Sequence, residues 1–185
     1  MSSPPDDSWY ARLRERWRPQ RVRVLLIGES APDPGADDRR FFYAPTLDRR
    51  DNLFRGVVHA LYGPIPRGST GQPKGPWLQC LKRDGVFLID LVPHPVDKLP
   101  PAKRRSARRE RTADCASEAA ALRPEVVIVC HGPTFDDLSP ALHAAGAPLM
   151  HNEPIPFPIG NHRAQFVSMA REALRRIGIE PPLEC

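Results

Sequence analysis

Three short segments that are almost entirely apolar constrain the fold of this chain most strongly. They are residues 22–27, 86–92 and 125–130, and each is followed by a loop and then by a segment of helical periodicity. Strands that are apolar on both faces are typical of a parallel sheet covered by helices on both sides. A further short strand is predicted at 148–150. We therefore predict an α/β fold, a three-layer α/β/α sandwich with a central, mainly parallel four-stranded sheet.

Helical patterns separate these strands. The predicted helices span residues 8–17, 52–62, 77–83, 103–122, 134–145 and 163–177. The segment 52–62 is amphipathic, and Gly63 and Pro64 directly after it are typical of a helix end. Residues 1–7 are interpreted as a disordered tail and residues 8–185 as a single domain, because a chain of this length can bury one core.

The charge balance is basic, with 27 Lys and Arg against 22 Asp and Glu, a net charge of +5 and a pI of about 9.3. Such a balance favours an anionic partner, nucleic acid first, although a coding bias toward Pro, Ala and Arg explains it equally well. A basic run is the candidate DNA-binding segment, and the alternative is a solvated helix face. Its members are Lys103, Arg104, Arg105, Arg108 and Arg109.

The four cysteines are widely spaced, with no Cys-x-x-Cys and no Cys/His cluster of zinc spacing. Cys115 in a predicted helix and Cys130 in a predicted strand are typical of reduced core thiols in a cytosolic protein. No apolar run has the length of a membrane span, and the first residues lack the apolar region of a signal peptide. We predict a cytoplasmic monomer that binds no metal and no membrane.

The first candidate site follows the first predicted strand. Its residues are Gly28, Glu29, Ser30, Ala31 and Pro32, with the aromatics Phe41, Phe42 and Tyr43 further along the same loop. Ligands of open parallel sheets bind at the carboxyl ends of strands. A glycine there lets the backbone approach a ligand, and aromatic rings can stack on a flat group. A tight turn followed by a hydrophobic anchor is the alternative interpretation.

Two more loops are expected at the same edge of the sheet. Asp90 lies in an otherwise apolar strand, where a carboxylate is costly unless it is satisfied, either by a ligand or by backbone at the strand end. His151 and His162 lie in a Pro-rich loop after the last predicted strand, with Asn161 and Arg163 beside them. Solvated histidines are the alternative.

The order of these segments resembles the uracil-DNA glycosylase superfamily. A strand ends in Gly-Glu-Ser-x-Pro, an aromatic cluster follows, then a strand of the form FLxD-x-V-P, the segment RPEVVIVCHG, and a Pro-rich loop before a helix with Phe. The resemblance is closest to the bacterial branches whose first motif reads Gly-Glu-Ala/Ser-Pro, and it covers residues 22–177. It implies hydrolysis of the N-glycosidic bond of a flipped damaged or deaminated base in DNA. The early Cys-x-x-Cys of the iron–sulfur branches is absent, so we expect no cluster and no cofactor.

The resemblance implies roles for single residues. The loop residues Glu29 and Ser30 would line the pocket and orient water, although the usual Asp or Asn falls at Ser30 or Ala31. Phe42, or one of its aromatic neighbours, would stack on the base. Asp90 would read the base edge, where many members of the superfamily carry Asn.

The last motif of the superfamily matches this chain poorly, and two alignments remain open. One places the anion-stabilising histidine at His151. The other alignment places Ile155 at the position of this histidine and lets Asn161 cap the last helix. In that case His162 would have to replace the missing anion-stabilising histidine. In either case Phe157, Ile155 or Ile159 is a candidate apolar wedge for the minor groove.

Asp90 carries a consequence for specificity, because an ionised Asp only accepts hydrogen bonds whereas Asn also donates. The pocket is therefore expected to disfavour uracil and to prefer a base that presents donors, unless a protonated Asp90 reads a ring acceptor. Two other functions remain open: a nucleic-acid-binding relative without catalysis, and a small-molecule serine hydrolase with Ser30 as nucleophile. The second lacks the late Asp-x-x-His of its class.

Overall fold

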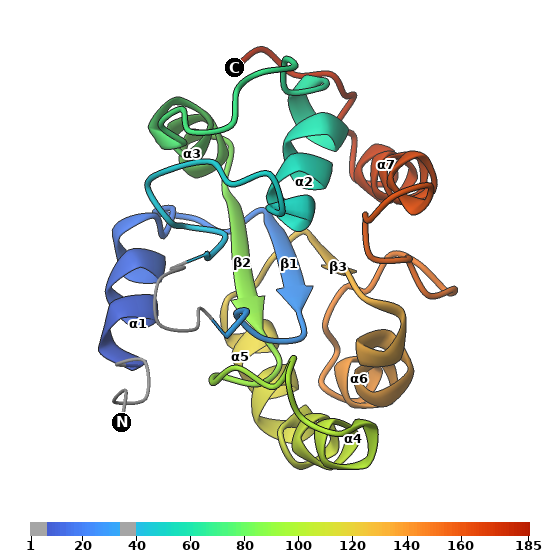
Figure 1. Cartoon of the computed structure of the whole chain (residues 1–185). Coiled ribbons are helices and arrows are strands. Elements are labelled where there is room, and N and C mark those ends of the chain that lie inside the picture. The colour runs from blue at the N-terminus through green and yellow to red at the C-terminus, as the bar shows by residue number, and fades with distance from the viewer. Residues whose placement is uncertain (1–6, 34–39) are drawn as a thin grey trace, which may run out of the picture.

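The protein is described by a computed structural model that covers residues 7–33 and 40–185. Three parallel strands form its sheet in the order β2-β1-β3: β1 (Val24–Gly28), β2 (Val86–Asp90) and β3 (Val126–Val129). The register places Gly28 of β1 opposite Asp90 of β2, so the two residues end their strands side by side. The α/β class and the parallel sheet are thus confirmed (Figure 1).

The prediction of four strands was wrong, because the sheet of the described residues has three. The segment around 148–150 does lie beside β3, where Leu149 makes a single parallel bridge with Val127. The N–H of Val127 donates to Pro148 O at 2.8 Å. Pro148 itself has no N–H to donate, so the ladder does not extend into a strand.

Helices fill the connections. They are α1 (Asp7–Arg16), α2 (Asn52–Tyr62), α3 (Gly75–Arg83), α4 (Pro101–Glu110), α5 (Thr112–Ala121), α6 (Gly132–Ala144) and α7 (His162–Arg175). The helix predicted over 103–122 is two helices, because the chain turns at Arg111 between α4 and α5. α1 begins at Asp7, the last residue of the segment predicted to be a disordered tail. Residues 1–6 of that segment lie outside the described residues.

The helices cover the sheet in two groups. α2 and α7 pack together on one face, where Val24, Leu26 and Ile128 of the strands meet Phe166 and Leu174 of α7. α5 and α6 pack together on the other side of the sheet (Figure 1). Helices on both faces explain why the strands are buried throughout, apart from Asp90 at the end of β2, where the residue as a whole is partly exposed although its side chain is buried.

The cysteines fall into two kinds. Cys115 and Cys130 are free and buried, as predicted, and burial raises the pKa of each thiol to about 12. Cys80 and Cys185 form a disulfide that the sequence analysis did not predict. In the part of the chain that the structure describes, no helix is long and apolar enough to cross a membrane.

Candidate functional site

A cavity of about 370 Å³ lies at the carboxyl ends of the strands. This is within the size range of small-molecule sites, roughly 300–1,000 Å³. Ten of the predicted site residues line it: Gly28, Glu29, Ser30, Ala31, Pro32, Phe41, Phe42, Asp90, Arg104 and Phe157. The wedge candidate Ile159 lines it too, and so do residues that were not predicted to form a site: Arg40, Arg50, Asp51, Asn52, Leu53, Phe54, Leu88, Asp97, Cys130 and His131. The three predicted loops therefore converge, as expected from the parallel sheet.

The aromatic cluster forms one wall of the cavity. Phe42 packs edge-on against Phe54, with ring centroids 5.2 Å apart, and against Tyr43 at 5.0 Å. Tyr43 does not line the cavity, because its hydroxyl bonds the backbone of Leu88 in β2, accepting from N at 2.6 Å. Phe41 and Phe42 are thus the aromatic residues of this cluster that a ligand can meet.

A buried lysine holds this wall in place. Lys74 is fully buried, and its Nζ donates to the carbonyls of Phe41 at 2.8 Å and Phe42 at 3.2 Å. Its third contact is the Asp51 carboxylate at 2.8 Å. An ammonium has three donors, and all three are used. Nothing in the local sequence pointed to Lys74, because its partners lie in other segments of the chain.

Asp90 forms an ion pair at the end of β2. Its side chain is 4% exposed, and Oδ2 accepts from Arg14 Nη2 of α1 at 2.7 Å. Burial raises the pKa of Asp90 above its usual value, and Arg14 opposes that rise. An ideal Cβ on Gly28 would lie 2.8 Å from Asp90 Oδ1, so a side chain at this position would force the carboxylate to shift.

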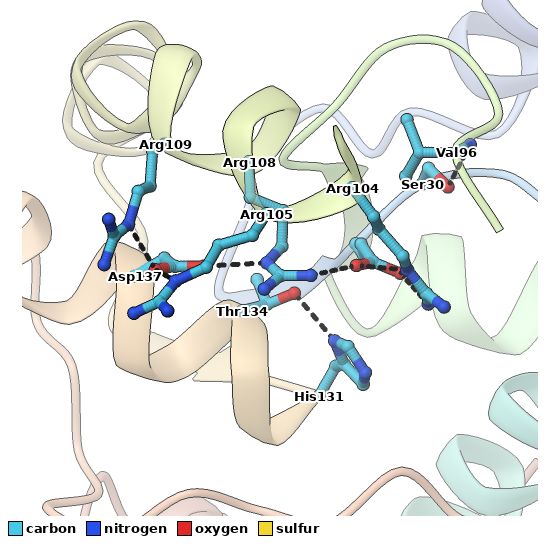
Figure 2. Close-up of polar contacts among 10 residues, drawn as sticks. Ser30, Val96, Arg104, Arg105, Arg108, Arg109, His131, Thr134 and Asp137 are labelled. Atoms are coloured by element: carbon cyan, nitrogen blue, oxygen red, sulfur yellow. Dashed lines mark hydrogen bonds and ion pairs between the residues drawn. The ribbon is translucent and has the colours of Figure 1, made fainter. Parts of the chain in front are cut away.

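Glu29 and Asp137 link the basic run to the sheet and to α6. Arg104 and Arg108 both donate to the buried Glu29 carboxylate, and Arg108 Nη1 lies 2.7 Å from Oε1. Arg108 also bonds Asp137 Oδ2 at 2.8 Å, and Arg109 bonds Oδ1 at 3.2 Å. Figure 2 shows these arginines reaching from α4 toward Asp137 on α6.

These ion pairs change the interpretation of the basic run as a DNA-binding segment. Arg104 and Arg108 are engaged with Glu29, and Arg108 is buried. Arg105 and Arg109 also form ion pairs with Asp137, but their side chains are 60% and 58% exposed. The run therefore docks α4 onto the domain, and Lys103, Arg105 and Arg109 are the members whose charge faces solvent.

Replacing Glu29 with Gln is expected to destabilise the protein by about 3 kcal/mol, because it leaves the buried Arg108 with half of its anionic partners. Burial would raise the pKa of Glu29, but the hydrogen bonds from Arg104 and Arg108 outweigh it and hold the pKa below its usual value. The contribution of Glu29 is therefore complete above the usual Glu pKa and is lost as pH falls through the lower folded value. Urea denaturation of the wild type and E29Q from about pH 7 to pH 3 measures this contribution to the free energy of unfolding.

The difference in unfolding free energy between the wild type and E29Q should thus shrink at the acidic end. The exposed Glu118 on α5 provides the matched control, since E118Q should change the unfolding free energy by less than about 0.5 kcal/mol. A difference between E29Q and the wild type that is independent of pH would contradict the ion-pair interpretation.

His131 is the cavity histidine that the sequence analysis missed. It follows β3 and precedes α6, and its Nδ1 lies 2.9 Å from Thr134 Oγ1 (Figure 2). Burial lowers the pKa of His131 below its usual value, and Glu29 opposes that shift. The ring is therefore neutral near pH 7, and Nε2 is bonded to none of the described residues. The signal was in the sequence: a His directly after the third apolar strand.

The two predicted histidines lie outside the cavity. His151 is buried, with Nε2 accepting from Val129 N at 3.0 Å and Nδ1 bonded to Glu153 O at 2.8 Å. Both ring nitrogens are thus used by backbone, which leaves none for a ligand. His162 is exposed at the start of α7.

The Pro-rich loop before α7 presents one side chain to solvent beside the cavity. Ile155 is fully buried, whereas Ile159 is 55% exposed and lines the cavity together with Phe157. Asn161 occupies the cap position of α7 but makes no side-chain cap bond. Arg163 also lies outside the cavity and donates to Asn52 Oδ1 at 3.0 Å. Of the three wedge candidates, Ile159 is the one that projects outward.

Two other chemistries find little support in this geometry. Ser30 Oγ accepts from Val96 N at 3.3 Å, and no histidine of the described chain is hydrogen-bonded to it. Within residues 7–33 and 40–185, no group of three or more His, Cys, Asp and Glu side chains is arranged to hold a metal ion.

Comparison of the chain with known protein families and with curated proteins gives no match. The function must therefore be inferred from the cavity itself.

Proposed function

We propose that the cavity binds a nucleobase extruded from DNA and that the protein is a DNA glycosylase of the uracil-DNA glycosylase type. Three segments far apart in the chain meet there: the loop after β1, which carries Phe42, the end of β2 with Asp90, and the loop before α7 with Phe157. This juxtaposition carries the proposal, because an enzyme that acts on an extruded base needs a stacking surface and a polar group for the base edge. The resemblance in motif order supports the same assignment.

We assign the stabilisation of the departing base to His131. A neutral imidazole that lines the cavity can donate to a developing anion from Nε2, and Arg104 beside it adds positive charge. His151 is held by backbone on both ring nitrogens and His162 lies outside the cavity, so neither suits this role as well. Ile159 at the cavity edge would fill the space that the extruded base leaves.

A glycosylase assay tests the proposal. Single- and double-stranded oligonucleotides carrying uracil, hypoxanthine, xanthine, alkylated amino bases and mismatches are incubated with the protein and then treated with alkali to reveal abasic sites. Cleavage of one of these should be lost in D90A and should fall by roughly 10²–10³-fold in H131Q. The exposed His143 on α6 is the control, and H143Q should cleave like the wild type.

A catalytically inactive relative that binds nucleic acid is the second candidate. The buried Ile155 and the backbone-bound His151 favour it, because no histidine reaches the cavity from the loop before α7. Salt-sensitive DNA binding without cleavage of any substrate would favour this candidate. Cleavage that survives in both D90A and H131Q would contradict the assigned site.

A further inference from the structure

We infer that the base bound in this cavity presents an amino group to Asp90, so that its ligands are amino-bearing bases of the cytosine, adenine or guanine type. Damaged derivatives that keep the amino group belong to the same class. Uracil, which carries a carbonyl in place of that group, is disfavoured. This inference rests on the proposed function, because it specifies the base for the same cavity.

The first step is the position of the Asp90 carboxylate. Arg14 binds it end-on, with one nitrogen on Oδ2 at 2.7 Å. Oδ1 lies on the side of Gly28, where an ideal Cβ would be 2.8 Å away. Gly28 and Asp90 both line the cavity, so Oδ1 is the carboxylate atom left for a ligand.

The second step is the charge of this carboxylate. The guanidinium of Arg14 stays protonated in proteins, so a neutral Asp90 would leave a half-buried cation without its anion. Burial acts in the opposite direction and raises the pKa of Asp90, and Glu118 on α5 and Glu29 after β1 add to this rise by repulsion. The contact with Arg14 at 2.7 Å opposes these effects, and in this ion pair Asp90 is the anionic partner, which accepts hydrogen bonds.

The third step is hydrogen-bond chemistry. An ionised carboxylate only accepts, so the atom facing Oδ1 must be a donor. The exocyclic amino group of cytosine meets this need, whereas the carbonyl at the same position of uracil places two acceptors against each other. A site built around a buried polar group strongly rejects an analogue that leaves it unpaired.

Matched ligand pairs test the inference. Deoxycytidine and deoxyuridine differ by an amino-to-carbonyl exchange and by the adjacent ring nitrogen, which accepts in the amino base and carries a hydrogen in the carbonyl base, and deoxyadenosine and deoxyinosine differ in the same way. Isothermal titration should show that the wild type binds the amino member of each pair at least about tenfold more tightly, because only this member donates a hydrogen bond to the charged carboxylate from its exocyclic group. D90N, which places a donor in the same space, should erase or invert the preference.

The isosteric control is D114N, because Asp114 on α5 is exposed and does not line the cavity. It should leave the preference unchanged. If D90N folds poorly because Arg14 loses its partner, the double variant R14M/D90N removes both charges and should lose the preference as well. In the wild type, the preference should decline as the pH is lowered and Asp90 becomes protonated, at a higher pH than for an exposed Asp, because burial raises the pKa of Asp90 above its usual value.

The outcomes separate the inference from the function on which it rests. Equal binding of both members of each pair to the wild type overturns the inference and leaves the base cavity standing. A preference for the amino member that persists in D90N also overturns the inference and leaves the base cavity standing. Failure of all four nucleosides to bind overturns the proposed base site together with the inference.

Discussion

Replacing Lys74 with Met is expected to lower the free energy of unfolding by about 3–5 kcal/mol, because it breaks a fully buried ion pair by removing one partner. Met has a similar length, so little space is left empty. The carboxylate of Asp51 and the carbonyls of Phe41 and Phe42 lose the donors that they share. The loss is a large share of the roughly 5–15 kcal/mol that keeps a domain folded.

Urea denaturation followed by tryptophan fluorescence measures this change. The control is K82M on the same helix, where Nζ donates to the single carbonyl of Arg16 at an exposed site. K82M should lower the free energy of unfolding by less than about 1 kcal/mol. The double variant D51N/K74M removes both charges and should recover part of the stability. If the free energy of unfolding of K74M lies within about 1 kcal/mol of the wild-type value, the assigned role of Lys74 is contradicted.

K74M should also impair the cavity. Lys74 holds the backbone of Phe41 and Phe42, and these rings form the wall on which a base would stack. A weaker hold on this wall is expected to reduce nucleoside binding under conditions in which K74M is still folded. K82M should bind nucleosides like the wild type.

Loss of the Cys80–Cys185 disulfide is expected to be the second large effect. The bond closes a loop with a sequence separation of 105 residues and ties the C-terminal segment to α3. Crosslinks over loops of this length typically stabilise by about 2–4 kcal/mol through the unfolded state. For a chain of this size, the melting temperature of C185S should fall by roughly 5–15 °C.

Thermal melts with and without a reducing agent measure this effect. The reducing agent should lower the melting temperature of the wild type to that of C185S and should leave C185S unchanged. The buried free thiol Cys115 is the control, since C115A keeps the disulfide and the reducing agent should lower its melting temperature by as much as that of the wild type. A wild type that is insensitive to the reducing agent would show that this bond adds nothing to stability. The experiment also bears on the cytoplasmic location predicted from sequence, because disulfides are rare in reducing compartments.

Local sequence determined the elements and the edge at which the site forms. Apolar strands alternating with helices predicted the parallel sheet, and parallel strands bring their carboxyl ends to one edge. That rule was sufficient to place Gly28, Phe42 and Asp90 in one cavity. It failed at 148–150, where strand propensity was present but Pro148 removed the hydrogen bond needed to extend the ladder.

Only the tertiary structure decided which charges are available. The basic run looked like a phosphate-binding face, yet Glu29 and Asp137 neutralise much of it, and both lie far from it in the sequence. Likewise, the ion-pair partner of Asp90 is Arg14 on α1, which lies 76 residues away in the sequence. The same holds for His131 and His151, since one lines the cavity and the other is bonded to backbone at both nitrogens. Hydrophobic periodicity is a local property that a sequence displays directly, whereas ion pairs and hydrogen bonds depend on which distant segments meet.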